Sequence, residues 1–330
     1  MLLPRVTFEF YLPSGLPRQS KRQERATKLP SSTPNIFVRS LNKGAGAATL
    51  KFWVWASLVS QILIVATGGL VRLTGSGLGC PTWPKCTDAN LVAVPEQGYH
   101  AFIEFGNRLL TFALAVIAVG TLVLVMRRGV IWRELRLRLP AWILLLGIPA
   151  QAVLGGITVW THLNPWFVGG HFILSAVMII TATVLVWRAY NLAPAVVPRL
   201  SYTLAPVVAV LGAIAVVVGV LVTGAGPHAG DATSPRNGLD LSVWEHYHSW
   251  PAYLLLAATA WQLYVLWRSE RSGRVTGIVQ LLLVVEVCQA IVGVAQARLG
   301  VPAALVEVHM LLASCLISLI AFSYLANRVK

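Results

Sequence analysis

Charged residues are scarce in this chain, since Asp, Glu, Lys and Arg make up only 12% of its 330 residues. A soluble protein of this length carries about twice that share, so the shortage excludes an ordinary soluble domain. The net charge of +14 comes without the basic and aromatic pattern of a nucleic-acid surface, which argues against nucleic acid as a partner. The first 50 residues also lack any apolar run long enough to span a membrane.

Residues 1–50 are rich in Arg, Lys, Ser and Pro, with only Glu9 and Glu24 as acidic residues. Such a composition has too little apolar surface to form a core, so it predicts a disordered cytoplasmic tail. A mitochondrial transit peptide is the competing interpretation, and the sequence does not decide between the two.

Hydrophobic residues make up 56% of the chain and are gathered in long runs. A run of about 20 apolar residues crosses a bilayer as a helix. Lipid offers no partner for backbone polar groups, so each run must be helical. The sequence therefore predicts an all-α polytopic protein whose main partner is membrane lipid. Its eight expected transmembrane helices cover residues 52–71, 108–126, 140–160, 167–187, 204–223, 250–267, 275–297 and 303–325.

Lys and Arg indicate which side of the membrane each connection occupies. The N-terminal tail, three connections and the C-terminal end hold 21 of the 26 basic residues, and all of these segments lie on one side. Basic residues stay on the cytoplasmic side, so we expect both termini to be cytoplasmic. The expected location is a bacterial inner membrane, with the mitochondrial inner membrane as the alternative.

The chain carries the same polar pattern twice. Gln151 precedes His171 by twenty residues, and Gln289 precedes His309 by the same interval, 138 positions later. The sequence therefore predicts two parallel four-helix repeats, residues 51–190 and 191–330. The other matches are Glu104-x-x-Asn107 with Glu245-x-x-His248, and Thr74-Gly-Ser-Gly77 with Thr223-Gly-Ala-Gly226.

The repeated histidines predict a metal site near the outer ends of the helices. Neutral imidazole is the commonest metal ligand, and two imidazoles on facing helices can hold a haem iron from both sides. For His248 with His309 we expect ligation rather than packing, because packing does not explain a pair at repeat-matched positions. We expect His171 to be the corresponding ligand of the first half. Its partner there would be Asn107, which occupies the position of His248 in the second half.

Glu104 and Glu245 each precede the polar residue of their repeat by three positions, which places both side chains on one helix face. A carboxyl group beside a cofactor can move protons. A helix-start carboxylate favoured by the helix dipole is the alternative, and it is the stronger one for Glu245.

Cys80 and Cys86 fall in the connection after the first expected helix, on the side where disulfides persist. A structural disulfide and a redox-active pair that passes electrons to a buried cofactor are both open. Cys288 and Cys315 fall within expected helices and are interpreted as apolar packing residues.

Several polar residues near the outer side have two interpretations. Arg72, Arg108 and His228 could bind haem propionates, or the arginines could anchor helix ends at the lipid head groups. His100 could supply a ligand that Asn107 cannot, or be a loop histidine. Glu286 lies in the middle of the seventh expected helix, has no repeat mate and receives no role.

These residues resemble the haem A synthase family, in its bacterial type that contains a cysteine pair. The resemblance implies two four-helix halves, with haem b held by His248 and His309 in the second. Substrate haem O would bind in the first half beside His171. Glu104 matches the catalytic carboxylate, and Cys80–Cys86 a disulfide of some members. The matching segments are GGLVRLTGSGLGCPTWPKC at 68–86, EFGNRLL at 104–110, QAVLGGITV at 151–159 and TGAGPHAGD at 223–231.

The resemblance implies oxidation of a ring methyl of haem O to a formyl group by successive hydroxylations, with haem O handed over by a haem O synthase. Asn107 departs from the family pattern Glu-x-x-His-Arg, and an asparagine is a poor iron ligand. A membrane b-type cytochrome that relays electrons is the alternative function. A transporter is a third, although paired broken helices are lacking. The electron donor is not named by the sequence, and a homo-oligomer is left open.

Overall fold

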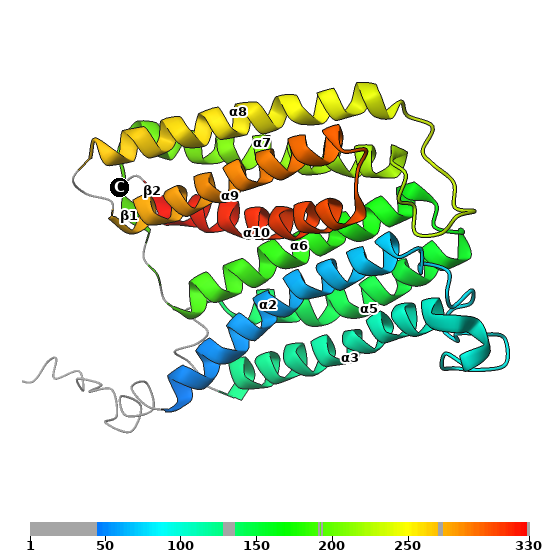
Figure 1. The fold of residues 1–330 in the computed structure, drawn as a ribbon. Coiled ribbons are helices and arrows are strands. Elements are labelled where there is room, and N and C mark those ends of the chain that lie inside the picture. The colour runs from blue at the N-terminus through cyan, green and yellow to red at the C-terminus, as the bar shows by residue number, and fades with distance from the viewer. Residues whose placement is uncertain (1–44, 128–135, 191, 193, 270–272, 329–330) are drawn as a thin grey trace, which may run out of the picture. The chain divides into compact units, whose positions relative to one another are not determined.

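The computed structural model describes residues 45–127, 136–190, 192, 194–269 and 273–328. The predicted all-α class is confirmed for this part of the chain (Figure 1). Most of the predicted tail, residues 1–44, and residues 128–135 of a basic connection lie outside the described residues. The helices are α2 (Ala45–Leu73), α3 (Gly98–Arg127), α5 (Arg138–Trp160), α6 (Pro165–Ala189), α7 (Arg199–Ala225), α8 (Leu241–Trp267), α9 (Gly273–Arg298) and α10 (Ala303–Ala326).

Seven of these eight helices are long and apolar enough to cross a membrane. Eight apolar transmembrane runs were predicted, and this number is corrected to seven for the described residues. The exception is α8, which is not apolar enough for a membrane span. The reason lies in its composition, because its first turns are polar and many of its later residues are Trp or Tyr. Its length of 27 residues equals that of α7.

Aromatic side chains form two clusters on α8, one near each end. Tyr247 packs edge-on against Trp244 and Trp250, with ring centroids 5.6 and 5.7 Å away. Trp261 stacks on Tyr264 with centroids 5.5 Å apart. At 1.5 Å per residue the two clusters lie roughly 25 Å apart. Trp and Tyr favour the two membrane–water interfaces, which are separated by a hydrocarbon layer about 30 Å thick.

Two of the helix starts are fixed by side-chain caps. The Asn164 side chain accepts the N–H of Trp166 at 3.1 Å, and Pro165 occupies the first position of α6. Asp240 accepts the N–H of Ser242 at 2.8 Å at the start of α8. The hydroxyl and the N–H of Ser242 hold the pKa of the Asp240 carboxyl below its usual range. The cap therefore keeps its charge, which the helix dipole favours at this end.

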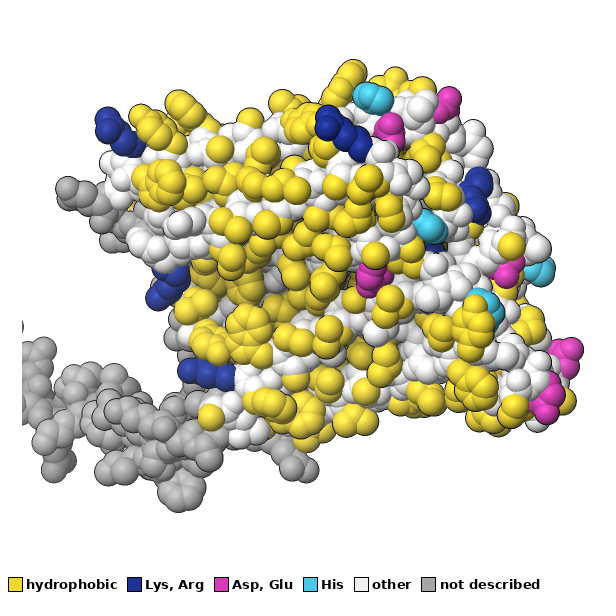
Figure 2. Space-filling view, viewed as in Figure 1, with side chains coloured by type: hydrophobic (Ala, Val, Ile, Leu, Met, Phe, Trp, Pro, Cys, Tyr) yellow, Lys and Arg dark blue, Asp and Glu magenta, His cyan; other side chains and the backbone are white. Residues whose placement is uncertain are grey.

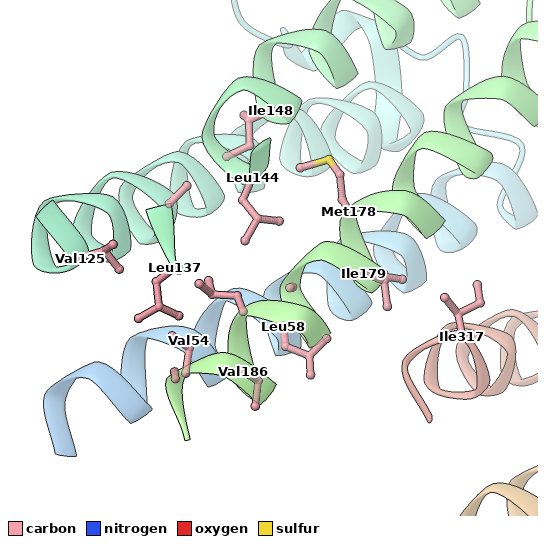
Figure 3. Packing of buried hydrophobic residues seen from close by; sticks show 14 of the residues in the cluster. Val54, Leu58, Val125, Leu137, Leu144, Ile148, Met178, Ile179, Val186 and Ile317 are labelled. Carbon is pink, nitrogen blue, oxygen red and sulfur yellow. The ribbon is translucent and has the colours of Figure 1, made fainter. Parts of the chain in front are cut away.

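Consecutive helices lie side by side, and α6 also packs against α10, which is distant in the sequence. Figure 1 shows α8 alongside α7 and α9 near α10, while α6 packs against α5, α7 and α10. The main hydrophobic cluster draws on α2, α3, α5, α6 and α10, as Figure 3 shows. Its labelled members are Val54, Leu58, Val125, Leu137, Leu144, Ile148, Met178, Ile179, Val186 and Ile317.

Buried hydroxyl pairs connect neighbouring helices within this apolar interior. The Ser57 and Thr121 hydroxyls lie 3.1 Å apart between α2 and α3, and both residues are buried. Thr183 and Ser318 make the same kind of contact between α6 and α10 at 2.9 Å. Small hydroxyl residues allow close helix approach and satisfy each other where no water is at hand.

The two ends of the described helices are joined differently. At the end that carries the C-terminal residues, β1 (Ala195–Val196) pairs in parallel with β2 (Asn327–Arg328). At the other end the loop after α2 meets the loop after α7, because the Gly77 N–H donates to the carbonyl of Gly230, four residues beyond the second Thr-Gly-x-Gly segment, at 2.8 Å. The outer loop of the first half thus rests directly on that of the second.

The surface between these ends is apolar. In Figure 2 hydrophobic side chains cover most of the visible face, whereas charged side chains and histidines lie mostly towards its two ends. Large hydrophobic residues such as Phe112, Leu146 and Ile291 are more than half exposed. A soluble protein rarely exposes so much contiguous apolar surface, so this face fits a lipid environment.

Leu144 and Leu146 on α5 test this assignment of interior and lipid-facing surface. Leu144 is 2% exposed inside the main cluster, whereas Leu146 is 60% exposed. Leu144→Ala should lower stability by about 2–5 kcal/mol, because it leaves a cavity. Leu146→Ala should change stability by about 0.5 kcal/mol or less. Thermal unfolding of both purified variants in detergent measures the difference, and equal shifts would contradict the assignment.

Candidate functional site

Two imidazoles face each other between α8 and α10. The ring centroids of His248 and His309 lie 6.2 Å apart, with ring planes inclined by 70°. The Nδ1 atom of each ring is buried and has no hydrogen-bond partner. Two imidazoles bonded at about 2 Å to opposite sides of one metal atom have centroids roughly 6 Å apart. The predicted pairing of these residues is thus matched by their separation.

Glycines on the neighbouring helices leave room for the two rings. A Cβ added to Gly219 of α7 would lie 2.9 Å from Cε1 of His248. A Cβ added to Gly293 of α9 would lie 3.2 Å from Cε1 of His309. Both separations are shorter than ordinary carbon–carbon contacts, so a larger residue would push the imidazole aside. The backbones of α7 and α9 therefore set the positions of the two rings.

His309 is also held through its backbone, and His171 is held in the same way. The amide of Gln289 donates to the His309 carbonyl at 3.1 Å, and that of Gln151 donates to the His171 carbonyl at 3.3 Å. Gly155 faces His171 as Gly293 faces His309, with 3.4 Å from the added Cβ to Cε1. These glycines were missed in the sequence, although they too lie 138 positions apart.

The first half places a different pair of polar atoms inside the helices. The Nδ1 atom of His171 and the Oδ1 atom of Asn107 are both buried and lack a hydrogen-bond partner. Imidazole is a good ligand for iron, whereas an amide oxygen suits harder metals such as calcium or magnesium. His171 is thus the stronger metal ligand of this pair.

Such a site suits a porphyrin better than a bare metal ion. No group of three or more His, Cys, Asp or Glu residues that could hold a metal occurs in the described part of the chain. A porphyrin supplies most of the ligands of its own iron, so one or two axial side chains are enough. The separation of the two imidazole rings therefore fits an iron porphyrin, the group expected from the sequence.

Cys80 and Cys86 form the predicted disulfide. Both residues are 0% exposed, and they pack against Ala101 in the first turns of α3. A soluble thiol would need the loop to open before it could reach the sulfur atoms. Whether the pair is structural or redox-active stays a prediction.

Arg108 fastens this loop to α3. Its side chain makes five hydrogen bonds, and a guanidinium has five N–H donors. Three of them go to the loop carbonyls of Cys80, Thr82 and Lys85, at 3.1, 3.1 and 3.2 Å. The other two go to Glu104 Oε1. The contacts favour a loop-fastening role for Arg108 over the propionate role expected for it.

Glu104 is the second anchor of the loop. It is 6% exposed, and its Oε2 atom accepts the backbone N–H of Cys80 at 2.7 Å. Its Oε1 atom pairs with Arg108 Nη2 at 2.5 Å. The carboxyl group is therefore buried and fixed at one position beside the disulfide.

His100 lies in α3 and not in a loop, which corrects one of the two alternatives for this residue. The helix begins at Gly98, ten residues before the predicted start, so His100 shares a face with Glu104. Its Nδ1 atom lies 2.8 Å from the Ser76 hydroxyl. The ring is thus engaged with the outer loop.

Arg72 lies in the last turn of α2, and His228 lies in the loop after α7. Arg72 Nη2 donates to the Thr223 carbonyl at 2.7 Å, and its Nε atom is buried without a partner. A buried N–H without an acceptor suits an anionic group such as a propionate. His228 Nε2 lies 2.8 Å from the Val301 carbonyl, so this ring already has a partner.

Trp83 is a further residue that the sequence did not indicate. Its indole packs so closely on α5 that a Cβ at Gly156 would lie 2.5 Å from a ring carbon. It also contacts Trp160 edge-on, with centroids 5.4 Å apart. The disulfide loop therefore packs on Gly156. The preceding residue, Gly155, is the one that faces His171.

Comparison with known proteins gives one family and several relatives. The family model for cytochrome oxidase assembly protein (COX15-CtaA) matches residues 51–321. A "Heme A synthase" of Listeria monocytogenes is 27% identical over 304 residues, which cover 85% of this chain and 96% of the relative. One of Geobacillus thermodenitrificans is 34% identical over 116 residues, and one of Geobacillus kaustophilus is 28% identical over 143. The last two matches span 35% and 43% of those relatives.

Arg108→Lys tests the fastening of the disulfide loop. A lysine ammonium has three donors and cannot reproduce the planar fork, so the loop should open more often. Reduction of Cys80–Cys86 by a soluble dithiol should become about tenfold faster or more. Timed reduction followed by thiol labelling measures this rate. Arg298→Lys, at an exposed residue of α9, is the control, and equal rates in both variants would contradict the proposed contacts.

Proposed function

Because this chain belongs to the cytochrome oxidase assembly protein family COX15-CtaA, we propose that it is a haem A synthase. In this proposal the protein is a membrane oxidoreductase that converts a ring methyl of haem O to a formyl group by successive hydroxylations. Its location would be a bacterial inner membrane, with both termini cytoplasmic. Haem O would come from a haem O synthase in the same membrane.

The facing imidazoles of His248 and His309 carry this proposal. With their rings 6.2 Å apart, these two residues would hold the iron of haem b. The close contacts with Gly219 and Gly293 hold the rings at that separation. Bound haem b would supply one-electron redox chemistry to the neighbouring half.

The repeated contacts around the histidines support two parallel four-helix repeats. The same Gln side chain and the same Gly face His171 and His309, at equal intervals along α5 and α9. Duplication of a four-helix unit explains this coincidence. It would also require α8 to cross the membrane together with the matching helix α3, which is long and apolar enough to do so.

Haem O would bind in the first half, where His171 is its axial ligand and Asn107 leaves the other side without a strong one. The buried Nε of Arg72 would meet a propionate of one of the two haems. Glu104 would hold or move a proton near the reacting methyl. Its fixed, buried carboxyl suits this task, since a general base must stay within hydrogen-bond reach of the substrate.

Removal of either ligand of the second half tests the cofactor. His248→Ala and His309→Ala should each lower the haem b content of the purified protein about tenfold or more. The absorption spectrum and the extracted pigment measure this content. His246→Ala is the control, since His246 is exposed on the same helix and bonds only the Ser242 carbonyl. Full haem b in both ligand variants would exclude the proposed site.

Glu104→Gln tests the reaction. In cells that supply haem O, the native chain should yield formyl haem, and Glu104→Gln should lower that yield about 100-fold or more. Its haem b spectrum should persist. Pigment extraction and mass analysis separate haem O from haem A. A native chain that binds haem b but forms no haem A would instead be a b-type cytochrome that relays electrons.

A further inference from the structure

Glu286 is a buried carboxyl group that the proposed reaction does not use. It lies midway along α9 and is 4% exposed. The Thr259 hydroxyl of α8 donates to its Oε1 atom at 2.9 Å. Its Oε2 atom is buried and has no hydrogen-bond partner. A carboxyl group at membrane depth is costly and marks a function more often than a packing need.

The internal repeat argues that packing does not require a carboxyl group at this place. The interval of 138 residues that relates α9 to α5 places Ile148 at the corresponding position. Ile148 is 7% exposed and belongs to the main hydrophobic cluster. An apolar side chain thus fills the equivalent position in the first half.

A cluster of four buried polar side chains lies between Glu286 and the end of the helices that carries the C-terminal residues. Gln262 Nε2 donates to the Ser201 carbonyl at 3.2 Å. The Ser201 hydroxyl donates to Asn327 Oδ1 at 2.9 Å, and Asn327 Nδ2 donates to the Ser323 carbonyl at 2.7 Å. All four side chains are at most 3% exposed. Three helices, α7, α8 and α10, therefore contribute polar groups to one buried cluster.

This cluster and Glu286 are joined by one turn of α8. Thr259 and Gln262 are three residues apart, so they lie on the same face of the helix, and both are 0% exposed. Gln262 Oε1 and the Ser323 hydroxyl lack partners, as Glu286 Oε2 does. Buried polar atoms of this kind are the usual sites of internal water, which typically bridges two to four groups.

A hollow opens beside this cluster at the same end. Its volume is about 300 Å³, and it is lined by Val196, Val197, Pro198 and Ser269. Pro198 caps α7 one turn before Ser201. Val196 belongs to the strand that pairs with Asn327 and Arg328. Water in this hollow would therefore stand one helical turn from the buried cluster.

We propose that Glu286 is a proton-binding site inside the membrane, reached from the end expected to face the cytoplasm. The path runs from the hollow through Ser201, Asn327 and Gln262 to Thr259 and Glu286, with water between the side chains. A proton entering along it would protonate the Glu286 carboxylate, and the same path would return it. The site does not require a bound porphyrin, so it can be tested without one.

Other ionisable groups on the helices around α9 lie at different places. Towards the outer end, α8 carries Glu245, His246 and His248, and α10 carries Glu307 and His309. The thiols nearest to Glu286 in depth are Cys288 on α9 and Cys315 on α10. Glu286 is one turn from Gln289, which holds the His309 carbonyl, and bonds neither histidine. The remaining ionisable residues of the three helices are Tyr247, Tyr253, Tyr264, Arg274, Arg298 and Tyr324.

Infrared spectroscopy of the carbonyl band of protonated carboxylic acids tests the proton site. The native protein should show a pH-dependent band that Glu286→Gln removes and Glu307→Gln keeps. Glu286→Gln has nearly the same shape and is expected to fold. Should it not fold, Thr259→Val removes the hydroxyl donor and should shift the band. A native protein without a Glu286 band at any pH at which it stays folded would overturn the proposal.

Exchange of that proton for deuterium tests the path. Gln262→Leu should slow the deuterium shift of the Glu286 band about tenfold or more, because it removes the polar link in the middle of the path. Gln296→Leu is the matched control, since Gln296 lies on α9 towards the outer end. Equal exchange in the native protein and Gln262→Leu would exclude this path, as would slower exchange in Gln296→Leu alone.

Discussion

An imidazole inside a membrane needs a partner, and the arrangement of the second half follows from this need. The rings of His248 and His309 have centroids 6.2 Å apart, a separation that would suit two imidazoles bound to one metal atom. Glycines on α7 and α9 are required because any side chain there would displace the rings. Four helices, α7 to α10, thus meet at these two side chains.

Much of the fold was predictable from the sequence, since long apolar runs have only one solution in lipid. The cysteine pair was also predictable, because the loop between Cys80 and Cys86 is short. The run predicted at residues 250–267 is a helix, α8, but it starts nine residues earlier, and its Trp and Tyr residues leave it less apolar than a membrane span. The early start of α3 was missed too, because its first turns mix polar and apolar residues.

The site was only partly predictable, because sequence patterns name residues but not their partners. The repeat pointed to His171, His248 and His309, and the neighbours of His171 and His309 then proved to be matched as well. It could not show that Arg108 turns towards the disulfide loop, since that depends on how the loop folds back on α3. The fixed position of Glu104 follows from the same loop.

In the proposed function, Asn107 would give the two halves different residence times for the porphyrins that they bind. A porphyrin held by two imidazoles dissociates only when both bonds break, so it stays as a permanent fixture. One held by His171 alone can be exchanged for the next molecule. Retention in one half and turnover in the other would thus depend on a single asparagine, in two halves that repeat the glutamine contact of His171 and His309.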